Sequence, residues 1–171
     1  MKRQIVAAIL FGFFFAAVGF GALTEVIYKP SELGEGRWQY EYSVENKDLF
    51  VPIQEFTIWF DFAKYDNLAV ETAEPLASQW DEVVWQPEPV LADDGAYDAM
   101  ALTVRIQLGK KVDGFAVSFD WLGEGGPGSQ FYEIIDPATF ETIDEGWTVP
   151  EPTTLILLGL AAIALSKKRK A

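Results

Sequence analysis

The middle of the chain alternates between apolar and polar residues at a period of two. The alternation is clearest in four stretches, 38–44, 56–62, 102–108 and 115–121. Successive side chains of a strand point to opposite faces, so each stretch is expected to form a strand with one buried and one solvated face. Weaker candidate strands are 69–72, 80–85, 130–135 and 140–143. Turn-forming residues separate these stretches, and no part of the region has the 3.6-residue period of an amphipathic helix.

Short strands with frequent turns predict an all-β fold. We expect a single antiparallel β-sandwich over residues 23–148, either jelly-roll or immunoglobulin-like. The pattern does not fix the order in which the strands are connected, so both arrangements stay open. The region is long enough for one domain with a hydrophobic core and too short for two.

The first residues have the layout of a secretory signal peptide. Met1–Gln4 is cationic, Ile5–Phe20 is apolar, and small residues follow up to Ala22. Residues 1–22 are therefore predicted to form a signal-peptide helix that a signal peptidase removes after export. The alternative is an uncleaved membrane anchor, which the polar residues after Ala22 disfavour.

The end of the chain divides into three parts. Val149-Pro150-Glu151-Pro152 is stiff and extended, because each proline fixes its own φ and keeps its predecessor out of the helical region. Thr153–Ser166 is apolar and Lys167–Lys170 is basic. A helix over the apolar run would be about 21 Å long against a hydrocarbon core of about 30 Å, so we expect a transmembrane helix that anchors the protein transiently. The prolines and the basic residues around the run disfavour the alternative, a buried core helix.

Charge predicts how these segments are oriented. Basic residues flank the apolar runs at both ends of the chain, and such clusters stay on the cytoplasmic side of a membrane. The acidic middle region is therefore expected to be delivered across the membrane.

Residues 149–171 resemble the PEP-CTERM sorting signal of exported bacterial proteins. The resemblance rests on Val-Pro-Glu-Pro-Thr, followed by Leu-Ile-Leu-Leu-Gly-Leu-Ala and a basic tail. It implies processing by an exosortase, a membrane enzyme that recognises Pro150, Glu151 and Pro152 and removes the hydrophobic tail. It also implies a link to exopolysaccharide or biofilm formation.

The middle region resembles the β-sandwich passengers that carry this tail. The shared motifs are Asp93-Asp94-Gly95, Gly114-Phe115, and Trp121-Leu122-Gly123 with the glycine-rich segment after it. This resemblance implies a fold and no site. Together with the tail, it implies a protein anchored first in the bacterial inner membrane and found afterwards at the cell surface or in the extracellular matrix.

The charge distribution and two missing residue types exclude several functions. The chain has 171 residues and a net charge of −13, but six of its 13 basic residues lie at its ends. Leaving out these six and Glu151, residues 22–149 carry 25 acidic and 7 basic side chains, a net charge of −18 that excludes nucleic acid as a partner. The chain has no histidine and no cysteine, which excludes imidazole bases, thiolate nucleophiles, disulfides and the usual zinc and iron–sulfur sites.

One acidic turn is a candidate calcium site. Asp93, Asp94 and Asp98 place three carboxylates within six residues beside Gly95. Calcium binds clusters of oxygen ligands on loops, although the spacing does not match an EF-hand. The alternative is a solvated turn in a protein that is acidic throughout.

Exposed aromatic residues are candidates for contact with sugar rings. Trp59 is the best of them, because it lies on the polar face of the expected strand 56–62. Trp80 and Trp85 are an odd number of positions apart, so a regular strand would place them on opposite faces. Trp38 and Trp121 fall on apolar faces and are expected in the core.

We expect no catalytic residues, and the alternative is a carbohydrate-active enzyme. A glycosidase needs only two carboxylates, and Asp61, Asp120 and Glu124 are the candidates on polar faces and loops. The glycine-rich segment 123–128 lacks the Gly-Lys-Ser/Thr ending of a phosphate-binding loop and is expected to be a flexible connection. The expected function is a structural or adhesive role outside the cell, in contact with exopolysaccharide and without a cofactor.

Overall fold

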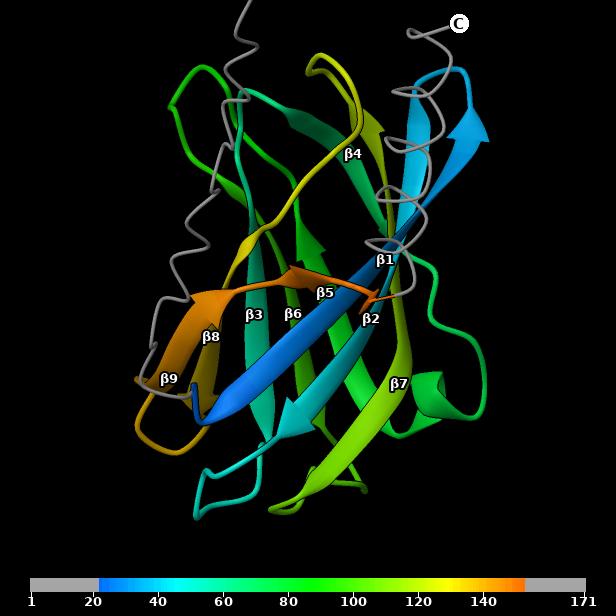
Figure 1. Cartoon of the computed structure of the whole chain (residues 1–171). Coiled ribbons are helices and arrows are strands. Elements are labelled where there is room, and N and C mark those ends of the chain that lie inside the picture. Colours follow the sequence, from blue (N-terminus) through cyan, green and yellow to red (C-terminus); the bar gives the residue numbers. More distant parts are fainter. Residues whose placement is uncertain (1–21, 153–171) are drawn as a thin grey trace, which may run out of the picture.

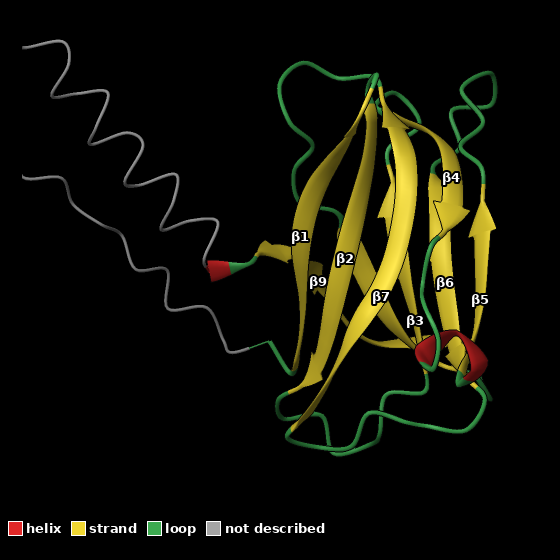
Figure 2. Cartoon of the chain, turned by 90° about the vertical axis from the view of Figure 1, so that its right-hand side faces the viewer, coloured by secondary structure: helices red, strands yellow, loops and turns green. Residues whose placement is uncertain are grey.

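The structure, a computed structural model, describes residues 22–152 as two five-stranded sheets packed face to face (Figure 1, Figure 2). The first sheet has the order β10 (Val149–Pro150), β1 (Thr24–Gly34), β2 (Arg37–Asn46), β7 (Lys110–Trp121), β4 (Tyr65–Val70). The second sheet has the order β5 (Trp80–Trp85), β6 (Gly95–Ala101), β3 (Glu55–Phe60), β8 (Phe131–Asp136), β9 (Glu141–Trp147). The predicted all-β antiparallel sandwich is confirmed.

The strand order is that of a jelly roll. Strands distant in sequence pair antiparallel, β2 with β7 and β3 with both β6 and β8, so successive pairs nest around the sandwich. The parallel contact between β1 and β10 is the exception. One short 3-10 helix, η1 (Leu76–Ser78), precedes β5.

The core lies between the sheets and is rich in aromatic rings. Phe115 on β7 makes edge-to-face contacts with Phe56 on β3 (ring centroids 4.9 Å apart) and with Trp80 on β5 (5.1 Å). On the same strand, Phe119 packs on Tyr40 and Tyr65 at 4.8 and 5.0 Å. The contacts of Phe115 join the two sheets, whereas those of Phe119 link neighbouring strands of the first sheet. The burial of these rings supplies the main stabilisation of a chain without disulfides.

A bulge in β7 keeps its apolar residues on the core side. Tyr42 pairs with Phe115, whereas the next residue of β2, Ser43, pairs with Asp113. Gly114 is the extra residue, with φ +101°, a conformation that a glycine adopts without strain.

The predicted strand over 102–108 is wrong. This segment is a loop that crosses from β6 to β7, and only Ile106 is buried in it, paired with Ile53 in an isolated bridge. The N–H groups of Leu102 and Thr103 both donate to Gln79 O, which turns the chain away from the sheet. Conversely, β1 and β6 lie in stretches for which no strand was predicted.

The ends of the chain lie outside the described residues except at their margins. The predicted signal peptide 1–22 is described only at Ala22, and the predicted anchor Thr153–Ser166 and its basic tail are not described. Between residues 22 and 152, no helix has both the length and the apolar character needed to cross a membrane.

Candidate functional site

A cleft of about 420 Å³ opens where β3 and β7 end and β8 begins. We call it the tryptophan cleft, because three indole rings line it together with one phenyl ring: Trp59, Trp121, Trp147 and Phe131. Charged side chains complete the wall, namely Asp61, Lys64, Asp94 and Glu124. The volume and the mixture of apolar walls with a few polar groups are typical of sites for small ligands or single chain segments.

Trp59 reaches the cleft from the outer face of β3. Its neighbours Ile58 and Phe60 are fully buried, so the alternation of the strand leaves the indole half-buried on the opposite face. Its Nε1 donates a hydrogen bond of 2.8 Å to Glu133 Oε2 on β8. This bond fixes the orientation of the ring, which reduces the entropy lost when a ligand packs on it.

Trp147 and Phe131 are brought together by the pairing of β9 with β8. The two residues are partners in the register, and their rings meet edge to face at 5.8 Å. Trp147 is 66% exposed, which makes it an accessible aromatic surface of the cleft. The sequence did not single out either residue, because pairing between β8 and β9 is needed to place them beside Trp59.

Trp121 closes the cleft at the end of β7. It was expected in the core, and it is half-buried: its ring packs edge to face on Tyr65 at 5.0 Å and also lines the cleft. Its Nε1 donates to Gly125 O (2.9 Å) in the glycine-rich segment. A Cβ at Gly123 would lie 2.4 Å from the indole ring, so this position requires glycine for close packing.

Two of the carboxylates that line the cleft, those of Asp61 and Asp94, have defined hydrogen-bond partners. Asp61 Oδ2 lies 2.7 Å from Lys64 Nζ, and Asp61 Oδ1 accepts the N–H of Ala63. The hydrogen bond from Lys64 is the main reason why the pKa of Asp61 is lowered, so this group is an ionised acceptor at neutral pH. Asp94 Oδ1 accepts the N–H of Phe62 (2.9 Å). The walls therefore offer carboxylate oxygens that can accept hydrogen bonds from ligand hydroxyl groups.

The three carboxylates named for a glycosidase do not form one centre. Asp61 and Glu124 line the cleft, but Asp120 lies outside its wall, where it accepts hydrogen bonds from Arg37 (3.0 Å) and Asn67. Those two bonds, with Asn67 the stronger influence, lower the pKa of Asp120. The proton donor of a glycosidase needs a raised pKa, so neither Asp61 nor Asp120 suits that role.

The residues of the predicted calcium site are not brought together. Asp94 binds the backbone in the loop before β6, whereas Asp98 lies inside β6 and accepts a hydrogen bond from Thr57 Oγ1 (2.7 Å). At about 3.3 Å per residue along the strand, their backbones are separated by roughly 13 Å. Asp93 is exposed in the turn. Among the residues that the structure describes, no group of three or more acidic side chains could hold a metal ion, so calcium at these residues stays a prediction without structural support.

The remaining tryptophans separate as the spacing predicted. Trp80 faces the core and is 1% exposed, whereas Trp85 on the same strand is 55% exposed. Trp85 lies on the edge strand β5, at the opposite side of the sheet from β9, and does not line the cleft. Trp38 is half-buried and packs against the core.

The predicted recognition residues of the sorting signal lie at the edge of the first sheet, beside β1. Pro150 belongs to β10, Glu151 follows it, and Pro152 is the last residue that the structure describes. The structure thus places the sorting motif and the tryptophan cleft on different strands of the sandwich.

Comparisons with known proteins identify the tail and a distant structural likeness. Residues 148–170 match the family model described as the PEP-CTERM protein-sorting motif, so the chain carries this signal and its export and processing by an exosortase are implied. A search of curated proteins gave no match. A family 3b carbohydrate-binding module from the biomass sensoring system of Clostridium clariflavum has a TM-score of 0.45 and 11% identity, covering 77% of this chain and 98% of the module. A cohesin module from a Clostridium perfringens family 33 glycoside hydrolase has a TM-score of 0.46 and 8% identity, covering 76% and 98%.

Proposed function

We propose that the protein is an exported component of the cell surface or extracellular matrix whose sandwich binds polysaccharide in the tryptophan cleft. The observation that carries the proposal is the convergence of Trp59, Trp121 and Trp147 on one cleft from three strands that are distant in sequence. Sugar rings have apolar C–H faces that pack on indole rings, and hydroxyl groups that donate to carboxylates. Asp61, which is ionised and held by Lys64, is the best-fixed acceptor beside the rings.

The sorting signal supports the same role. Until a membrane enzyme removes the tail, the sandwich stays at the membrane, and it reaches the cell surface or the matrix afterwards. The predicted anchor Thr153–Ser166 holds it there during this time. The exopolysaccharide of the producing cell is then the polysaccharide nearest to the cleft. Biofilm formation is the process in which such a protein would act as an adhesive or structural component.

Affinity electrophoresis of the purified protein in gels that contain the producer's own exopolysaccharide tests the proposal. Trp147→Ala removes the exposed ring of the cleft and is expected to weaken binding by about tenfold, the equivalent of about 1.4 kcal/mol. Trp85→Ala is the matched control, since it removes an exposed tryptophan from another strand of the same sheet, outside the cleft. Equal retardation of the wild type and Trp147→Ala, or equal loss in both variants, would contradict the assignment of the cleft.

The same samples distinguish binding from hydrolysis. A binding protein leaves the polysaccharide intact, whereas a glycosidase with paired carboxylates produces new reducing ends. We expect no increase in reducing ends during incubation. An increase that Asp61→Asn abolishes would instead support the alternative, a carbohydrate-active enzyme.

A further inference from the structure

The sorting motif begins as a strand of the sandwich. Val149 and Pro150 form β10, which pairs parallel with β1 in the register Ile27 with Val149 and Tyr28 with Pro150. The N–H of Glu151 extends the pairing with a 2.9 Å hydrogen bond to Tyr28 O. The backbone of the first two residues of the Pro-Glu-Pro tripeptide is therefore occupied by the edge of a sheet.

Thr148, directly before the motif, is buried and keeps the motif close to the sandwich. Thr148 is 1% exposed, and its N–H donates to Gln130 O (2.8 Å). Its hydroxyl accepts the N–H of Gln130 (2.9 Å) and donates to the side-chain oxygen of the same residue (3.1 Å). Three residues of extended chain span about 10 Å, so Glu151 stays within that distance of the sandwich surface while the bonds of Thr148 hold.

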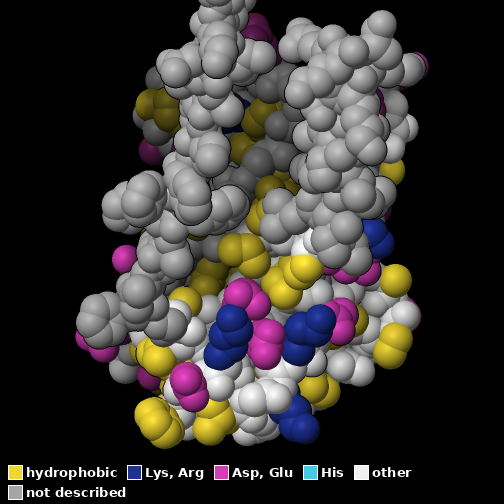
Figure 3. Space-filling view, viewed as in Figure 1, with side chains coloured by type: hydrophobic (Ala, Val, Ile, Leu, Met, Phe, Trp, Pro, Cys, Tyr) yellow, Lys and Arg dark blue, Asp and Glu magenta, His cyan; other side chains and the backbone are white. Residues whose placement is uncertain are grey.

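The side chain of Glu151 also meets the sandwich. It lines a pocket of about 260 Å³ together with Lys29, Lys111 and Asp113 on β1 and β7. Lys29 pairs with Glu41 and Lys111 with Asp113, so charges of both signs surround the pocket, and side chains of both signs lie side by side on this face (Figure 3). The hydrogen bond to Asp113 is the main reason why the pKa of Lys111 is raised, and the charges of Asp113, Glu45 and, last, Glu151 add to it.

We propose that the edge of β1 is a binding site for the protein's own sorting motif, and that the motif must leave this edge before the exosortase can bind it. Enzymes and receptors that read a short peptide commonly bind it extended, through its backbone and its side chains. The N–H of Glu151 cannot donate to Tyr28 O and to an enzyme at the same time, and an enzyme that binds Val149 and Pro150 as a strand would take the place of β1. The inference rests on the sorting signal and is independent of the tryptophan cleft.

The pairing of β10 with β1 is weak. Pro150 has no N–H to donate, so β10 is limited to two residues and few backbone bonds. Short edge segments with few bonds open locally far more often than the whole domain unfolds. The folded passenger therefore reduces the rate of tail removal by the fraction of time that β10 is closed, and it does not prevent removal.

A disulfide between β1 and β10 tests the proposal in one direction. The chain has no cysteine, and Ile27 and Val149 are directly paired, so the double variant Ile27→Cys with Val149→Cys can form only this one intramolecular bridge. The assay incubates the purified full-length precursor with membranes that contain the exosortase and follows the loss of the tail by mass. We expect the oxidised variant to be cleaved about tenfold more slowly or worse, and reductant to restore the rate.

The single variants are the controls for changes to the motif itself, and both are expected to be insensitive to reductant. A rate that is equal in the oxidised and reduced double variant would overturn the proposal. If the wild-type precursor is not cleaved at all, the motif is not a substrate and the proposal falls with it.

An insertion tests the opposite direction. About ten Gly and Ser residues between Thr148 and Val149 leave the tripeptide and tail intact but let the motif move away from β1. We expect faster cleavage than in the wild type. The control is the same insertion between the exposed residues Val90 and Leu91, far from β10 in the sequence, which is expected to leave the rate unchanged. Equal rates in both insertion variants would contradict the proposal that pairing with β1 slows cleavage.

Discussion

Tyrosines occupy several of the most buried positions in this core, and each needs a partner for its hydroxyl group. Tyr40 donates to Gly128 O at 2.7 Å and Tyr42 to Gln130 Oε1 at 3.4 Å. Burial is the main reason why the pKa of both hydroxyls is raised, so they stay protonated donors at every physiological pH. Gln130 also donates to Tyr65, and the same side chain bonds to Thr148. These bonds offset the loss of hydration of the buried polar groups and connect the core to the residue that anchors the sorting motif.

Two aspartates shift in opposite directions and predict opposite effects of neutralisation. Burial raises the pKa of Asp98, with a further contribution from Asp81. A raised pKa means that Asp98 favours folding below its ordinary pKa of about 3.9, and that this stability is lost as the pH rises through the folded value. Asp98→Asn is therefore expected to raise the free energy of unfolding at pH 7, and the gain should vanish below about pH 3.9.

Asp120→Asn is the matched control for Asp98→Asn. Because the pKa of Asp120 is lowered, it favours folding above about pH 3.9, and this stability is lost as the pH falls through the folded value. Asp120→Asn should therefore lower the free energy of unfolding at pH 7, by less than about 1 kcal/mol because the ion pair is at the surface. Denaturant titrations of both variants at neutral and acidic pH check the signs, and equal signs at pH 7 would refute the argument.

At the scale of elements, alternation of apolar and polar residues predicted strands correctly where one face of the segment is buried. The prediction failed where the alternation is present but the segment is exposed. The expected strands 38–44, 56–62 and 115–121 lie on β2, β3 and β7, which form the centre of the two sheets. The segment 102–108 alternates equally well, but β6 already fills the neighbouring position in the sheet. β6 itself was missed because Gly95–Ala101 consists mostly of small residues, whose burial comes from contacts with neighbouring strands.

The loop 102–108 provides a test of that distinction. Ile106 is fully buried and bridges to Ile53, whereas Val104, two positions earlier, is 39% exposed. Ile106→Ala is expected to destabilise the protein by about 2–5 kcal/mol, because it leaves a cavity in the core. Val104→Ala should change the free energy of unfolding by no more than about 0.5 kcal/mol. Similar losses in the two variants would show that the segment packs as a strand.

The sequence pattern predicted only part of the candidate site. Trp59 was predictable from a single strand, because an aromatic residue on a polar face stands out locally. Trp147 and Phe131 meet it only through the pairing of β3, β8 and β9, which no local pattern specifies. Trp121 follows the apolar face of β7, and its second role in the cleft arises from the glycine-rich segment that folds back on it.

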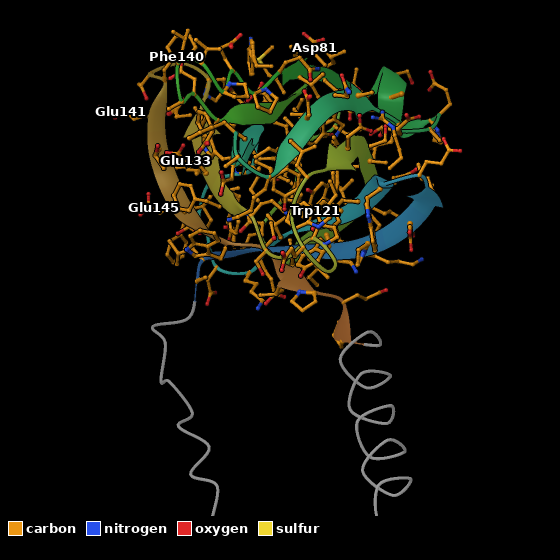
Figure 4. All side chains as sticks on the ribbon, turned by 90° about the horizontal axis from the view of Figure 1, so that it is seen from above. Asp81, Trp121, Glu133, Phe140, Glu141 and Glu145 are labelled. Atoms are coloured by element: carbon orange, nitrogen blue, oxygen red, sulfur yellow. The ribbon has the colours of Figure 1, made fainter. Side chains whose placement is uncertain are left out.

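At the scale of the whole molecule, the sandwich is held together against its own charge. Within residues 22–152 the structure has five ion pairs, each between partly exposed side chains. Most acidic groups of the body therefore repel one another, and Glu133, Glu141 and Glu145 lie on one side of the molecule along β8 and β9 (Figure 4). The acidic residues on the edge strand β9 also oppose pairing of this edge with the edge of another sheet.

This balance predicts that sodium chloride stabilises the protein. At about 0.1 M salt the Debye length is near 10 Å, so repulsion between acidic groups on different strands is screened, whereas contacts within an ion pair are screened less. Because residues 22–149 carry a net charge of −18, the screened repulsions outnumber the five weakened attractions. The melting temperature, measured by circular dichroism, is expected to rise as salt increases from about 0.01 to 0.3 M. Potassium chloride should act equally, since the effect depends on ionic strength and not on the cation. A melting temperature that falls with salt would mean that the ion pairs, and not the repulsions, dominate the electrostatics of the sandwich.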